Sequence, residues 1–99
     1  MREEARGSEE APRLTLLVRA YCHLCDEMRS AMAPLLAAAG VTFEEIDVDS
    51  DPGLEARWGD WIPVLLAGER ELCHYRLDRA ALAKHLAARA ARGDSTTVA

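Results

Sequence analysis

Two cysteines, Cys22 and Cys25, follow closely after a short apolar run, and no other feature of the chain constrains its fold more. The run, residues 14–18 (LTLLV), is typical of a strand that is buried on both faces. Behind it, apolar side chains recur at the three-and-four spacing of one helical face up to Gly40; they are Leu24, Met28, Ala31, Leu35 and Ala38 or Ala39. The sequence therefore predicts that the Cys-x-x-Cys pair lies where a buried strand turns into a helix.

The middle of the chain predicts a second strand and a short helix. Polar and apolar residues alternate through the second half of residues 41–49, as in a strand with one exposed face. Asp51 followed by Pro52 marks a helix start, because the carboxylate can accept from free amides of the first turn and proline needs no hydrogen bond there. This short helix is expected to end at Gly59. Pro34, inside the preceding long helix, is expected to kink that helix.

The last part of the chain predicts a hairpin and a final helix. Residues 62–67 and 71–76 are typical strands, with a turn at 68–70 between them. Asp78 is a natural N-cap for the helix that follows. That helix is expected to turn four apolar side chains inward, namely Leu82, Ala83, Leu86 and Ala90. The predicted order is thus strand, helix, strand, short helix, strand, strand and helix.

This order predicts an α/β fold with a mixed four-stranded sheet. The first helix makes a crossover between two parallel strands, and the third strand is expected to run antiparallel to the first. The chain of 99 residues supports one domain, which we place at residues 13–92. Residues 1–12 and 93–99 are expected to be disordered tails, because they are mostly charged, small or polar.

Composition and charge exclude several classes of function. The formal net charge is -5 and the 12 Lys and Arg residues are scattered, so no nucleic acid partner is expected. No apolar stretch reaches the length of a signal peptide core or the roughly 18 residues of a membrane span, so we expect a cytoplasmic protein without membrane contact. Three cysteines are too few for the disulfide framework of a small secreted domain, and their use is expected to be chemical.

The predicted position of Cys22 at the first turn of a helix favours a thiolate, because unpaired amides and aligned peptide dipoles there attract negative charge. Helix N-termini lower cysteine pKa values from about 8.5 to roughly 3.5 to 7.5, and only the thiolate attacks a disulfide. Cys25 is close enough on the same face to form a disulfide with Cys22. We therefore expect Cys22 to be the nucleophile and Cys25 the resolving thiol, with a protonated His23 as further support for the thiolate.

Other uses of the cysteine pair stay open. The pair could form half of a zinc site whose remaining ligands are Cys73, His74 or His23, although the chain has no second Cys-x-x-Cys. The chain could also be an interaction module that binds metal or senses redox state, without turnover as an enzyme. Cys73 by itself is expected to be a passive buried thiol. His85 has no identifiable partner and is assigned no role.

Three motifs resemble the glutaredoxin branch of the thioredoxin superfamily: residues 21–25 (YCHLC), 47–52 (DVDSDP) and 61–64 (WIPV). Over roughly residues 13–90 the chain looks most like the small glutaredoxin-like domains. The resemblance implies a minimal thioredoxin fold and a thiol-disulfide oxidoreductase without a bound cofactor. We further expect a monomer that acts on disulfide-containing proteins or on glutathione mixed disulfides.

The resemblance also implies supporting roles at the site. Pro63 would be a cis-proline, and Ile62 before it would pair its backbone with an extended thiol substrate. Tyr21 and His23 would complete an accessible, partly polar turn around the cysteines.

The chain departs from the glutathione-using members in several motifs. His and Leu stand between Cys22 and Cys25 where those members usually have Pro and Tyr, and the Gly-Gly near the last helix is absent. Arg19 and Asp78 could stand in for the basic and acidic contacts to the substrate. Trp61 could form part of an apolar rim for docking a partner.

Overall fold

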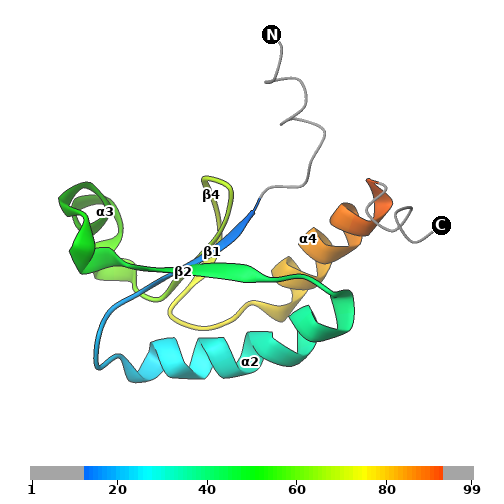
Figure 1. The fold of residues 1–99 in the computed structure, drawn as a ribbon, viewed down its shortest axis with the longest axis horizontal. Coiled ribbons are helices and arrows are strands. Elements are labelled where there is room, and N and C mark those ends of the chain that lie inside the picture. The colour runs from blue at the N-terminus through cyan, green and yellow to red at the C-terminus, as the bar shows by residue number, and fades with distance from the viewer. Residues whose placement is uncertain (1–12, 93–99) are drawn as a thin grey trace, which may run out of the picture.

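A mixed four-stranded sheet organises residues 13–92, the part of the chain that the computed structural model describes (Figure 1). The predicted tails, 1–12 and 93–99, lie outside the described residues. The elements in chain order are β1 (Leu14–Val18), α2 (His23–Ala39), β2 (Phe43–Asp47), the 3-10 turn η1 (Val48–Ser50), α3 (Pro52–Trp58), the 3-10 turn η2 (Gly59–Trp61), β3 (Val64–Ala67), β4 (Arg70–His74) and α4 (Arg79–Ala91).

The strand order in the sheet is β2-β1-β3-β4. β1 runs parallel to β2, and β3 is antiparallel to both β1 and β4. The long helix α2 is the crossover between the two parallel strands, as the sequence predicts. The α/β fold class and the antiparallel third strand are therefore confirmed.

Side chains on the two faces of β1 enter two separate clusters, which explains why its sequence is apolar at successive positions. Leu16 joins the larger core under α2 and α4, where Met32 and Leu82 are completely buried. Leu17, on the opposite face, packs with Val64 in the smaller cluster that α3 covers. The sheet is thus enclosed between two helices on one face and one short helix on the other (Figure 1).

The buried face of α2 differs from the predicted one. Its buried residues are Cys25, Met28, Met32 and Leu36. Of the residues predicted to face inward, Met28 is buried, three are half-buried and the last alanines are exposed: Leu24, Ala31, Leu35, Ala38 and Ala39. The physical reason is size, because long methionine and leucine side chains fill the core and alanines gain little from burial. The helix continues through exposed Pro34, and Gly40 ends it with a φ of 69°.

The predicted strands end at different residues in the structure. The second strand is shorter than residues 41–49, because Asp47 accepts a hydrogen bond from the amide of Asp49 at 2.9 Å and starts a 3-10 turn. The third begins at Val64, after Pro63, which lacks the N–H that a ladder needs. The fourth ends at His74, because Tyr75 takes a φ of 66°, outside the extended region.

The inward face of α4 was also partly mispredicted. Leu82 is buried and Leu86 half-buried, as expected, but Ala83 and Ala90 are exposed. His85 takes the inward position one turn after Leu82 and is buried. None of the helices in residues 13–92 combines the length and the apolarity needed to cross a bilayer.

Candidate active site

Cys22 and Cys25 form a disulfide at the start of α2. Cys22 is the N-cap residue of the helix, and Cys25 lies in its first turn. Their Cα atoms are 5.2 Å apart, within the range that a disulfide requires. The predicted junction of strand, cysteine pair and helix is therefore present in the structure.

The two cysteines differ in exposure and in hydrogen bonding. Cys22 is half-buried, whereas Cys25 is only 1% exposed and lies against the core. The amide of Cys25 donates to Cys22 Sγ at 3.1 Å. In the reduced protein this amide and the positive end of the helix dipole would stabilise negative charge on Cys22. The arrangement therefore leaves Cys22 open to a substrate and keeps Cys25 behind it.

Tyr21 and His23 flank Cys22 on the solvent side. Tyr21 has a φ of 59° and a fully exposed side chain, and its left-handed backbone reverses the chain from β1 into α2. The side chain of His23 is 84% exposed, and its Nε2 lies 2.9 Å from a carboxylate oxygen of Glu27. Glu27 also contacts Nη1 of Arg76 at 3.5 Å. When His23 is protonated, the carboxylate of Glu27 therefore offsets part of the positive charge that His23 places near Cys22.

Ile62 and Pro63 lie at the end of the sheet where β1 leads to the cysteines. The pairing of Leu17 with Val64 sets this position, because Pro63 directly precedes Val64. The Ile62–Pro63 peptide bond is cis. The carbonyl of Pro63 accepts a hydrogen bond from the amide of Tyr75 at 2.9 Å. This contact joins the end of the hairpin to the segment before β3.

An aromatic cluster of Trp61, His74 and Tyr75 borders this segment, and of these residues the sequence predicts a docking role only for Trp61. The ring of His74 lies edge-on at 5.1 Å from Trp61 and 4.7 Å from Tyr75. The Tyr75 hydroxyl donates to the carbonyl of Asp60 at 2.7 Å. Trp61 and Tyr75 are exposed, as is Tyr21 beside the cysteines. No local sequence signal marks this cluster, because the pairing of Val64 with His74 in the hairpin brings its members together.

Arg19 joins the end of β1 to the segment that precedes β3. Its Nε lies 3.2 Å from a carboxylate oxygen of Asp49, and its Nη2 lies 2.8 Å from Glu55. Its Nη1 donates to the carbonyl of Gly59 at 3.3 Å. The hydrogen bond to Asp49 raises the pKa of Arg19, so the guanidinium keeps its charge. These contacts favour a positioning role for Arg19, and its contact with substrate stays a prediction.

Replacement of Arg19 by glutamine is expected to speed amide hydrogen exchange several-fold in residues 52–61, because α3 and η2 lose their link to β1. Hydrogen exchange followed by mass spectrometry measures this. The control is Arg13→Gln at the other end of the sheet, where Arg13 is 3.8 Å from Glu44. Equal exchange in the Arg19→Gln protein and the wild type would contradict the positioning role.

Asp78 and Cys73 serve the structure of the C-terminal half. Asp78 is the N-cap of α4 and accepts a hydrogen bond from the amide of Ala81 at 3.0 Å. Its contact with a substrate stays a prediction. Cys73 is buried in the main core, as predicted, and burial raises the pKa of its thiol. The thiol therefore stays protonated near neutral pH.

The zinc hypothesis requires further ligands beside the cysteine pair. Across residues 13–92, no group of three or more His, Cys, Asp or Glu side chains is arranged to hold a metal ion. His74 instead contacts a carboxylate oxygen of Glu71 and lies edge-on to the rings of Trp61 and Tyr75.

Several known proteins resemble this chain in sequence and fold. An uncharacterized protein of Mycobacterium tuberculosis is 36% identical over 72 residues, which cover 68% of this chain and 74% of that protein. A solved structure from Nitrosomonas europaea has a TM-score of 0.68 at 33% identity and covers 77% of this chain and 92% of its own. One from X. campestris has a TM-score of 0.60 at 37% identity, with 76% and 96% covered.

A more distant structure shares the fold alone. Glutaredoxin C1 from populus tremula x tremuloides is 17% identical, with a TM-score of 0.53 over 90% of this chain and 88% of its own. The sequence model of the family described as Glutaredoxin-like domain (DUF836) matches residues 13–87, well over half of the chain. The chain therefore belongs to the family of glutaredoxin-like domains (DUF836).

Proposed function

We propose that this protein is a thiol-disulfide oxidoreductase that uses the Cys22 and Cys25 pair on protein disulfides or on glutathione mixed disulfides. The observation that carries the proposal is the unequal placement of the two sulfurs. Cys22 is accessible at the N-terminus of α2 and accepts from the amide of Cys25, while the Cys25 side chain is buried behind it at disulfide distance. A nucleophile and a resolving thiol need this arrangement.

The reaction proceeds in two exchanges. The Cys22 thiolate attacks one sulfur of the substrate disulfide, the substrate S–S bond breaks, and its other sulfur leaves as a thiolate that takes up a proton. Cys25 then loses its proton and attacks Cys22 Sγ, which releases the second substrate sulfur as a thiol. Two electrons pass from the protein to the substrate, and the protein retains the Cys22–Cys25 disulfide. An external thiol reductant returns the pair to its reduced form by the reverse exchanges.

Residues of the segment before β3 and of the hairpin end would support the binding of a substrate. An extended substrate segment would pair with the backbone of Ile62 next to Pro63, as the resemblance to glutaredoxins implies. Trp61 and Tyr75 offer exposed rings beside this segment for apolar side chains of a protein substrate. A cytoplasmic location fits the reaction, because thiols are kept reduced there.

The test follows the thiols of the wild-type protein. The reduced protein has three cysteines, and we expect excess oxidised glutathione or insulin to convert Cys22 and Cys25 to a disulfide. Cys73 should remain a thiol, because it is buried and burial raises its pKa. Alkylation under denaturing conditions followed by peptide mass spectrometry identifies the remaining thiol. Three free thiols after this treatment would contradict the proposal, as would a stoichiometric metal in protein purified without chelator.

A further inference from the structure

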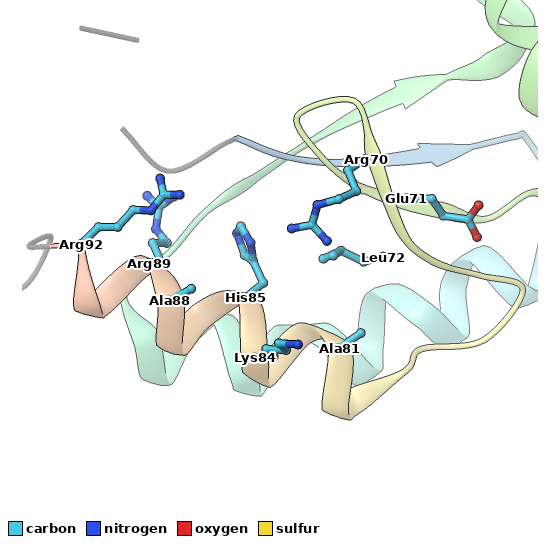
Figure 2. Close-up of a pocket in the computed structure, with 9 residues that line it drawn as sticks. All are labelled: Arg70, Glu71, Leu72, Ala81, Lys84, His85, Ala88, Arg89 and Arg92. Carbon is cyan, nitrogen blue, oxygen red and sulfur yellow. The ribbon is translucent and has the colours of Figure 1, made fainter. Parts of the chain in front are cut away.

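A cavity of about 480 Å³ lies between β4 and α4 (Figure 2). Arg70 and Leu72 of β4 form one wall, and the facing wall is formed by α4, including Lys84 and His85. The volume lies within the roughly 300 to 1,000 Å³ typical of pockets for small organic molecules. Leu72 and alanines of α4 add apolar surface to a wall that is otherwise rich in cations.

Three cations that line this cavity have no carboxylate partner within residues 13–92. No carboxylate of that part of the chain forms an ion pair with Arg70, Lys84 or Arg92. The carboxylate that lines the cavity, Glu71, contacts His74 instead. The whole chain has a net charge of -5, so this concentration of cations is contrary to its overall charge. The cavity therefore attracts anions.

His85 gives an independent indication of a ligand. Its side chain is only 7% exposed, and Nε2 has no hydrogen-bond partner in the described part of the chain. Burial lowers the pKa of His85 and the charges of neighbouring arginines lower it further, so the ring is neutral at pH 7. Figure 2 shows the ring extending from α4 into the space between Arg70 and Arg89. Buried polar atoms without a partner are uncommon in proteins, and a bound molecule would supply one here.

We propose that this cavity binds a small organic polyanion, one that carries at least two phosphoryl or carboxylate groups. The guanidinium of Arg70 can pair with such a group through two parallel hydrogen bonds, and Lys84 and Arg92 supply further positive charge. The apolar surface of Leu72 receives the organic part. The Nε2–H of neutral His85 donates a hydrogen bond to an oxygen of the bound anion and gains the partner that it lacks.

The site is separate from the cysteine pair. Arg70 pairs with Ala67, which in turn pairs with Leu14 at the start of β1, whereas Cys22 follows the opposite end of that strand. The cavity and the disulfide therefore lie at opposite ends of the sheet. Binding of the polyanion is expected to be the same for the oxidised, the reduced and the Cys22→Ser protein, so its test does not depend on the proposed oxidoreductase activity.

Isothermal titration calorimetry of the full chain in phosphate-free buffer tests the proposal, with ADP and citrate as probes and adenosine as the uncharged control. We expect ADP or citrate to bind one to one. Tighter binding of ADP would show that the site prefers phosphoryl groups, and tighter binding of citrate that it prefers carboxylate groups. Arg70→Gln and Lys84→Gln should each weaken this binding about tenfold, because each removes a charge-assisted contact. Arg79→Gln is the matched control, since Arg79 lies on α4 outside the cavity.

Three outcomes would overturn the proposal. One is that neither ADP nor citrate produces binding heat. Another is that Arg79→Gln weakens binding as much as Arg70→Gln, which would indicate attraction by diffuse surface charge. The third is that a single-stranded oligonucleotide binds while ADP and citrate do not, which would make this face a nucleic acid surface.

Discussion

The Cys22→Ser variant is expected to reduce protein disulfides about 1,000-fold more slowly than the wild type, or not at all. Cys22 is the accessible sulfur of the pair, and a serine hydroxyl at the helix start is not ionised near neutral pH. The fold should persist, because serine is also a favoured N-cap residue. The rate of insulin disulfide reduction by the chemically reduced protein measures the effect. Full activity of Cys22→Ser would contradict the assignment of the nucleophile.

The Cys25→Ser variant separates the two exchanges. Cys22 can still attack, but no second thiol resolves the mixed disulfide, so the adduct with the substrate should accumulate. Intact mass spectrometry detects this adduct as the added mass of one substrate thiol. A glutathione mixed disulfide, which a second molecule of glutathione can resolve, should be turned over better by this variant than a protein disulfide. The matched control is Cys73→Ser, which should keep the wild-type rate, because Cys73 is a buried free thiol that takes no part in the Cys22–Cys25 disulfide.

The order of the elements was predictable because each one has a strong local signal. The apolar run of β1, the N-cap at Asp51 with Pro52, and the N-cap at Asp78 all lie where the sequence predicts them. At the two helix starts, one residue type with a defined hydrogen-bonding preference sets the boundary. The position of the cysteine pair was predictable as well, because β1 ends shortly before it and the apolar periodicity of α2 runs from it to Gly40.

The mispredicted faces have a common physical cause. The sequence predicts that Ala83, Ala90 and either Ala38 or Ala39 face the core, but all four alanines are exposed. Alanine is compatible with either environment because its small side chain loses or gains little on burial, so an alanine-rich helix does not specify its own rotation. The larger residues Met32 and Leu82 determine the rotation through contacts with the sheet.

The surroundings of the cysteine pair depended on contacts that the sequence does not reveal. Arg19 binds Asp49 and Glu55, which are 30 and 36 residues away. Trp61 meets His74 only because the hairpin brings the two segments together. Such contacts arise from the register of the strands, and local periodicity contains no information about them.

Two neighbouring positions on the inner face of α4 are expected to respond to substitution with opposite signs. His85→Leu should raise the free energy of unfolding by about 1–2 kcal/mol, because it removes a buried nitrogen that has no hydrogen-bond partner in the described residues and adds apolar surface to the interior. Leu82→Ala should lower that free energy by about 2–4 kcal/mol, because Leu82 is 0% exposed and its truncation leaves a cavity in the main core.

Urea unfolding of both variants in phosphate-free buffer, followed by circular dichroism, measures these changes. A bound polyanion would stabilise the wild type more than the leucine variant, so the two proteins are first compared without such anions. With ADP or citrate added, the wild type should gain stability while His85→Leu gains less. A residue that serves ligand binding is expected to lower the stability of the free protein and to increase the stabilisation that the ligand gives. We expect both effects of His85. A loss of stability in His85→Leu would instead mean that the imidazole contributes to the packing of the core.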